Sequence, residues 1–164
     1  MLMALRHLLA ILLLPVMVVG VVPRWLLAAF RAVDTRWPPG ALGLAGRALG
    51  AVLLAAGLAL FVWCVSLFAR VGRGTLAPWD PTTRLVAVGP YRHVRNPMIT
   101  SVCTMLAAQA LLAGSLVLAG WFAFVLVLNH LHFLLVEEPG LEERFGAAYR
   151  EYKARVPRWL PKPR

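Results

Sequence analysis

Acidic residues are scarce in this chain of 164 residues: seven Asp and Glu stand against 17 Lys and Arg, and charged residues make up only 15%. So few charges in a chain that is 60% hydrophobic argue against a soluble domain, whose surface carries many more. Cysteine is limited to Cys64 and Cys103, and both lie in apolar segments, which excludes a disulfide framework and a cysteine metal site. These scarcities indicate an integral membrane protein.

What the chain has instead is long apolar runs. Ala48–Ala69 is 22 residues without a charge, and Met98–Val136 is a second such run of 39. A helix needs about 20 apolar residues to cross a bilayer core of about 30 Å, so the second run is long enough for two crossings. Its weakest helical point is Gly114-Ser115, which predicts a hairpin of two helices over about 98–113 and 116–137.

The N-terminal apolar stretch predicts one more span, over about Leu2–Val22 and ended by Pro23-Arg24. A secretory signal peptide is the alternative, because Arg6 precedes the apolar residues, but no clean small-residue cleavage site follows. The sequence therefore predicts an all-α, polytopic membrane protein with about four transmembrane helices.

The basic residues predict the orientation of these spans. With both termini in the cytoplasm, 13 Lys and Arg lie inside and four lie outside, namely Arg24, Arg31, Arg36 and Arg47. The segment "RWLLAAFRAV" from Arg24 is expected to be an interfacial helix whose arginines snorkel. The net charge of +10 then reflects topology and attraction to anionic lipid headgroups, and requires no nucleic acid. A bacterial inner membrane is the expected location.

Polar residues gather in the loop 70–97, before the second apolar run. Turn residues at 78–81 and a short segment "RLVAV" at 84–88, expected to be extended, precede Pro97, which suits the first turn of a helix. A helix N-terminus preceded by Arg92 and Arg95 would favour an anion such as a carboxylate or phosphate. The alternative is that these arginines serve membrane topology alone.

Ionisable side chains also occur at the end of the last predicted span. His130 and Glu137 are seven residues apart and fall on one helical stripe, while Glu138 points about 100° away. A helix C-terminus disfavours anions, so both glutamates are expected to need cationic partners. For His130 and His132 the alternative is a hydrogen bond to a neighbouring helix.

The C-terminal tail has apolar side chains at helical spacing, which predicts one amphipathic helix ended by Pro157 on the cytosolic face. The residues of this stripe are Leu141, Phe145, Tyr149, Tyr152 and Val156. Such a helix could be a membrane-surface anchor. It could also be a lid that brings Arg155 or Arg158 over the loop and the glutamates.

Two linked motifs carry a resemblance to a known family. "GPYRHVRNPMITS", a hydrophobic span and "EEPGLEERFGAAYREYKARVPRWLP" together resemble membrane methyltransferases related to isoprenylcysteine carboxyl methyltransferase and the phospholipid N-methyltransferases. The resemblance covers about residues 72–161. It implies an N-terminal membrane part over 1–69 and a catalytic core over 70–164.

The resemblance implies a site for S-adenosylmethionine at the cytosolic membrane boundary, without a metal. The residues expected to bind this cofactor are Val88, Gly89, Tyr91, Arg92, His93, Arg95, Asn96, Pro97, Glu137 and Glu138. Arg155 and Glu137 are the expected catalytic residues. The implied methyl acceptor is membrane-embedded or amphiphilic, either an isoprenylcysteine-like carboxylate or a lipid amine.

Two departures from the family pattern keep alternatives open. Ile99 and Ser101 stand where the family has Tyr and Gly, which favours a small non-enzymatic membrane subunit whose site has decayed. An NADPH-dependent reductase of related fold is the other alternative. An argument against decay is that charges which are costly at a membrane boundary are kept together, namely Arg95, Glu137, Glu138 and Arg155.

Overall fold

A computed structural model describes residues 12–72 and 83–159, and these residues contain helices and loops but no strand. Several helices continue into π-helical or 3-10 segments, which are labelled η. The elements in chain order are η1 (Leu12–Val21), α2 (Val22–Ala29), α3 (Ala41–Leu67), η2 (Phe68–Gly72), η3 (Gly89–Arg92), α4 (Pro97–Ala113), α5 (Leu116–His132), η4 (Phe133–Glu137), α6 (Glu138–Phe145) and α7 (Ala147–Arg155). The all-α prediction is confirmed for the described residues.

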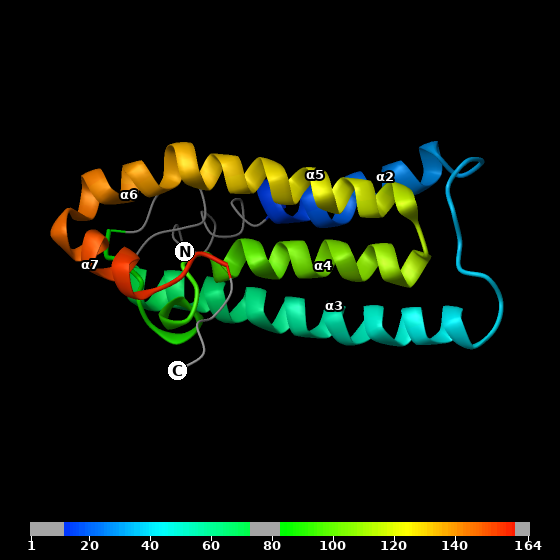
Figure 1. Cartoon of the computed structure of the whole chain (residues 1–164), viewed down its shortest axis with the longest axis horizontal. Helices are drawn as coiled ribbons and strands as arrows, with labels where there is room; N and C mark the ends of the chain where they lie inside the picture. Colours follow the sequence, from blue (N-terminus) through cyan, green and yellow to red (C-terminus); the bar gives the residue numbers. More distant parts are fainter. Residues whose placement is uncertain (1–11, 73–82, 160–164) are drawn as a thin grey trace.

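The helices α3, α4 and α5 lie side by side and define the long axis of the molecule (Figure 1). Glycines on α3 allow a close approach to α4, because a Cβ on Gly57 would lie 2.8 Å from the Met105 side chain and 3.1 Å from the Ser101 carbonyl. Buried Phe61, Leu106 and Val125 fill the space among the three helices. The buried Ser101 thus lies at the crossing of α3 and α4, where its backbone carbonyl faces Gly57.

Two continuous helical stretches in the described part of the chain are long and apolar enough to cross a membrane: Ala41–Gly72 and Leu116–Phe145. Two shorter apolar helices, Pro15–Ala29 and Pro97–Ala113, accompany them. The hairpin was predicted correctly, since α4 ends at Ala113 and α5 begins at Leu116. Four complete crossings remain a prediction.

The helix does not break at Pro23-Arg24, where the first span was predicted to end, but continues through Pro23 to Ala29 and so includes the start of the predicted interfacial segment. Proline has no N–H, so Pro23 cannot donate to the carbonyls of the preceding turn. Two of these carbonyls accept bonds from side chains instead: Val19 O from Gln109 Nε2 (2.8 Å) and Val18 O from Trp121 Nε1 (3.1 Å). Neighbouring helices thus satisfy the groups that proline frees. The residues before Leu12 lie outside the described part.

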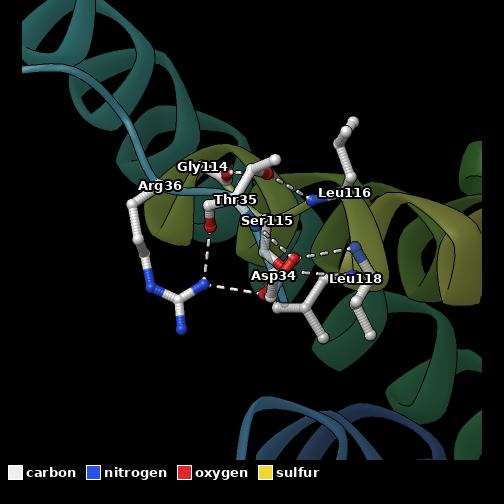
Figure 2. A network of polar contacts seen from close by, with 8 residues as sticks. Asp34, Thr35, Arg36, Gly114, Ser115, Leu116 and Leu118 are labelled. Atoms are coloured by element: carbon white, nitrogen blue, oxygen red, sulfur yellow. Dashed lines mark hydrogen bonds and ion pairs between the residues drawn. The ribbon is translucent and has the colours of Figure 1, made fainter. Parts of the chain in front are cut away.

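The loop after α2 caps the turn of the α4–α5 hairpin (Figure 2). The side chains of Asp34 and Thr35 accept from the N–H groups of Val117 (3.1 Å) and Leu116 (3.0 Å). Ser115 Oγ accepts from Leu118 N–H (3.0 Å), so three of the otherwise free donors at the start of α5 have partners.

Asp34 is the centre of this cap, with no exposed side-chain surface. Its carboxylate also accepts from Ser115 Oγ (2.5 Å) and Arg36 Nη1 (2.7 Å). Desolvation alone would raise the pKa of Asp34, but the hydrogen bonds from Ser115, Val117 and Arg36 outweigh it and lower the pKa to about 2. We call this cluster of Asp34, Thr35 and Ser115 the hairpin clasp.

The single amphipathic helix predicted for the tail is divided into α6 and α7. The division lies at Gly146, whose φ of 54° is in the left-handed region that favours glycine. The predicted extended segment 84–88 forms no strand, and the predicted turn at 78–81 lies outside the described residues. Loop 83–96, α6 and α7 gather at the end of the bundle opposite the hairpin clasp (Figure 1).

Candidate functional site

A buried carboxylate surrounded by cations lies at this end of the molecule. Glu138 is only 4% exposed, and its Oε1 accepts from Arg95 Nη1 at 2.7 Å and from Arg158 Nε at 2.8 Å. Lys153 Nζ lies 3.6 Å from its other oxygen. The prediction that the glutamates need cationic partners is confirmed for Glu138. We call Glu138, Arg95, Arg158 and Lys153 the charged cluster.

Three segments distant in sequence build this cluster. Arg95 lies just before α4, where Asn96 Oδ1 accepts from Ile99 N–H (3.2 Å) and Pro97 occupies the first helical turn. The C-terminal segment is bound to the same loop, because Arg95 N–H donates to the carbonyl of Pro157 (2.9 Å). This bond places the following residue, Arg158, over Glu138. Of the two arginines that the sequence placed over the glutamates, Arg158 contacts Glu138 and Arg155 does not, and the action of the tail as a lid remains a prediction.

The register of α5 explains why Glu138 is the buried glutamate. The sequence predicts that His130 and Glu137 share a stripe, but this is wrong by one residue. The helix passes through the π-helical η4 between them, and the wider turn takes up one extra residue. Glu137 is consequently exposed, and Glu138 takes the inward position on the side of His130.

Tyrosines from α7 and η3 line the charged cluster. Tyr152 Oη donates to the backbone carbonyl of Tyr91 at 2.7 Å, which joins α7 to the loop before α4. Tyr149 is 1% exposed, and burial together with the nearby Glu138 carboxylate raises the pKa of its hydroxyl. The hydrogen bond to Glu138 raises the pKa of Arg158, so that guanidinium stays charged.

Several buried polar atoms around the cluster lack hydrogen-bond partners among the described residues. These atoms are Tyr91 Oη, Arg95 Nε, Asn96 Nδ2 and Tyr149 Oη. Buried polar groups in proteins are nearly always paired, and each unpaired group costs about 1–3 kcal/mol. Tyr91 Oη points toward Cys64 in the helix core, so the other three atoms are those next to the charged cluster, and Tyr149 Oη lies beside the Arg95 guanidinium without a well-aligned bond. These three atoms could form hydrogen bonds to a polar ligand.

A groove of about 490 Å³ adjoins the cluster and shares Glu138 and Lys153 with it. Its walls carry charges of both signs: Lys153 Nζ lies 3.4 Å from Glu142, and Arg150 Nη1 lies 3.9 Å from the same carboxylate. Leu134 and Pro139 supply apolar surface. A groove with both signs can accept a zwitterion, such as the ammonium and carboxylate of an amino acid.

The structure brings together some of the predicted site residues and not others. Those at or next to the charged cluster, all wholly or largely buried, are Tyr91, Arg95, Asn96, Pro97 and Glu138. Those exposed at the surface are Val88, Arg92, His93, Glu137 and Arg155, and Gly89 is half-buried with φ +59°. Arg155 pairs with Glu151 at 3.3 Å on the outer face of α7.

Sequence reasoning did not identify Lys153, Tyr149 and Tyr152 as residues of the candidate site. The two tyrosines were assigned to an apolar stripe, although each carries a hydroxyl that must find a partner when buried. Two tyrosines three residues apart on one face, with Lys153 beside them, were the available signal.

Comparison with known proteins agrees with the family predicted from the motifs. The phospholipid methyltransferase family matches residues 45–148, which is more than half of the chain. An uncharacterized protein of Haemophilus influenzae is 42% identical over 64 residues, covering 38% of this chain and all of that protein. No solved structure matches the chain significantly. The chain belongs to the phospholipid methyltransferase family.

Proposed function

We propose that this protein transfers a methyl group from S-adenosylmethionine to an amphiphilic acceptor, an isoprenylcysteine-like carboxylate or a lipid amine, at the cytosolic face of a bacterial inner membrane. The observation that carries the proposal is the charged cluster with its unpartnered buried polar atoms. Membership in a methyltransferase family supports the reaction class. Four crossings with both termini inside would place the cluster at the cytosolic boundary.

The residues at the cluster fit this cofactor chemically. S-adenosylmethionine supplies an electrophilic methyl group on a sulfonium when it is bound. Its methionyl end carries one ammonium and one carboxylate, which the groove of mixed charge suits through Glu142 and Lys153. Asn96 Nδ2 and Tyr149 Oη would form hydrogen bonds to other parts of the cofactor.

The cluster carries surplus positive charge that would serve an anion. Arg95, Arg158 and Lys153 share the single buried carboxylate of Glu138, while Lys153 also contacts Glu142. An acceptor carboxylate or a lipid phosphate would balance this surplus. Arg155 remains the predicted catalytic residue by resemblance, and we propose that it contacts the acceptor only when the substrates are bound.

The protein's own contribution would be orientation and exclusion of water. Methyl transfer needs no covalent intermediate, and holding the two reactants in line at short distance supplies a large part of such a rate. Buried Glu138 and Tyr149 are fixed by packing and would lose little freedom on binding. Exposed Glu137 is proposed to place its charge near the sulfonium.

Calorimetric titration of the detergent-purified full chain tests this function. S-adenosylmethionine and S-adenosylhomocysteine are expected to bind at micromolar concentration, and NADPH is expected not to bind. Binding of NADPH alone would assign the protein to the reductases. A folded sample that binds none of the three would favour a non-enzymatic subunit.

A pair of neighbouring tyrosines gives a sharper test of where the cofactor binds. Tyr149→Phe removes a buried hydroxyl that lies beside the Arg95 guanidinium without a well-aligned hydrogen bond, so we expect stability to change by less than about 1 kcal/mol and the affinity for S-adenosylmethionine to fall several-fold. Tyr152→Phe is the matched control, because its hydroxyl has a partner in Tyr91 O. That change should cost about 1 kcal/mol of stability and leave affinity nearly unchanged. The reverse pattern would place the cofactor elsewhere.

A further inference from the structure

A second cavity, distinct from the charged groove, lies among α3, α4, α5 and the C-terminal segment. Its volume is about 640 Å³, within the range of pockets for drug-sized ligands. Its lining residues are Leu53, Thr100, Cys103, Thr104, Ala107, Phe122, Leu126, Val127, His130 and Trp159. We call it the apolar cleft. None of these residues carries a permanent charge, in contrast to the charged cluster nearby.

The polar side chains of the apolar cleft are largely occupied within their own helix. Thr100 Oγ1 donates to the carbonyl of Asn96 (3.0 Å), and Thr104 Oγ1 donates to that of Thr100 (2.8 Å). Hydroxyls that bond back to the preceding turn present mainly methyl groups to their surroundings. The cleft therefore suits a hydrocarbon and disfavours a charged headgroup, because a charge would find no partner there.

Among the described residues of the lining, His130 alone keeps a nitrogen donor for a ligand, because its bond with Trp159 occupies only the other ring nitrogen. Trp159 Nε1 donates to His130 Nδ1 at 3.0 Å, and the two ring centroids lie 5.9 Å apart. Because Nδ1 accepts this bond, the proton of the neutral imidazole lies on Nε2. His130 can therefore donate one hydrogen bond to an uncharged oxygen. Phe133, whose ring centroid is 6.4 Å from that of Trp159, supports the indole from behind.

Two consecutive residues join the charged cluster to the apolar cleft. Arg158 contacts Glu138, and the next residue, Trp159, contacts His130. Building on the proposed function, we infer that the apolar cleft holds a single hydrocarbon chain of the methyl acceptor. His130 Nε2–H then donates to the oxygen next to that chain, and Trp159 covers the chain. The acceptor class is a single-chain amphiphile with a neutral oxygen between its chain and its methylated group.

Quenching of tryptophan fluorescence by a brominated chain tests this inference. The probe is 11-bromoundecanol added to the full-length protein in detergent, and the contribution of Trp159 is obtained by difference from Trp159→Phe. We expect saturable quenching of Trp159. Ala107→Phe fills the cleft and should raise the half-saturating concentration about tenfold or more. Ala123→Phe is the matched control on the exposed side of α5, expected within about twofold of wild type.

The role of His130 is tested by comparing 11-bromoundecanol with 1-bromoundecane. The alcohol should bind wild type about fivefold more tightly than the alkane, because only the alcohol can accept from Nε2–H. His130→Phe should abolish this preference, and His130→Gln, which keeps a donor, should retain part of it. An equal preference in all three proteins would overturn the assignment of His130, even if one variant folded poorly.

Other outcomes separate this inference from the proposed function. Quenching that never saturates, or that Ala107→Phe leaves unchanged, would overturn the hydrocarbon site. Saturable quenching by a brominated diacyl phosphatidylcholine that displaces the alcohol would assign the cleft to bilayer lipid and overturn the single-chain acceptor. If the chain bound but S-adenosylmethionine did not, the cleft would stand and the methyltransferase function would fail.

Discussion

The two ends of the bundle each bury one carboxylate, and the two are satisfied in opposite ways. Asp34 in the hairpin clasp is bound by a hydroxyl, backbone N–H groups and one arginine, which come from its own loop and from the turn between α4 and α5. Glu138 is held by long cationic side chains from separate segments, and several polar atoms around it have no partner in the described residues. A carboxylate whose surroundings are completely paired marks a structural element, whereas incomplete pairing marks a place prepared for a ligand.

Glu138→Gln should have the largest effect on function. The loss of a charged acceptor for Arg95 and Arg158 should weaken S-adenosylmethionine binding by about 2–3 kcal/mol, or roughly 30- to 150-fold. Calorimetry on folded protein measures this loss. The matched control is Glu151→Gln on the exposed face of α7, which should bind as wild type does. If Glu138→Gln bound S-adenosylmethionine as wild type does, the proposal that Glu138, unlike Asp34, belongs to a ligand site would be wrong.

Asp34→Ala should have the largest effect on stability and little on binding. It leaves the Ser115 hydroxyl and the Val117 N–H without their acceptor, which should cost about 2–3 kcal/mol in the free energy of unfolding. Thermal unfolding in detergent measures the loss, with Arg36→Ala as the milder control, because the Arg36 side chain is about half exposed and the other partners of Asp34 remain. A strong loss of cofactor affinity in folded Asp34→Ala would contradict a purely structural clasp.

Two nearby arginines should separate cofactor binding from turnover. Arg158→Ala removes a partner of buried Glu138 and should weaken cofactor binding about tenfold. Arg155→Ala removes an exposed pair with Glu151, so its stability should change by less than about 0.5 kcal/mol. If Arg155 is catalytic, kcat falls while cofactor affinity stays constant. Equal losses of both quantities in Arg155→Ala would reduce its role to a structural one.

The smallest expected effect is a dependence on pH at the hairpin clasp. The pKa of Asp34 falls from 3.8 to about 2 on folding, so the ionised group stabilises the fold fully above pH 4. This contribution is lost as the pH falls toward 2. The difference in melting temperature between wild type and Asp34→Asn should be constant from pH 8 to about 5 and narrow below about 4. A difference in melting temperature that stays constant down to pH 2 would contradict the lowered pKa of Asp34.

The elements that could be predicted from sequence depend on local chemistry. Gly114-Ser115 marked the hairpin because a left-handed glycine and a capping serine end one helix and start the next. The start of α4 followed in the same way from Pro97. The continuation of the helix through Pro23 could not be predicted. The backbone carbonyls that Pro23 leaves without a donor accept hydrogen bonds from Gln109 and Trp121, which are distant in sequence.

The candidate site was predicted in its residue types but not in its geometry. Arg95 and Glu138 were identified by the resemblance, and Arg95 Nη1 lies 2.7 Å from Glu138 Oε1. The π-helical turn in η4 exchanges the expected orientations of the Glu137 and Glu138 side chains, because a prediction from periodicity assumes 3.6 residues per turn throughout. The hairpin clasp was missed entirely, since Asp34 stands among ordinary loop residues and its partners lie about 80 residues later in the chain.

The bond between Arg95 N–H and the Pro157 carbonyl has a consequence for biosynthesis. The ribosome makes α3, α4 and α5 well before residues 157–159, at a rate of about 5–20 residues per second. Residues 157–159 supply Arg158 to Glu138 and Trp159 to His130, so the contacts of both side chains depend on residues made after the bundle. A chain that ends before Pro157 would keep the helical bundle and lose these C-terminal partners, so a truncation can separate the stability of the bundle from the completeness of the candidate site.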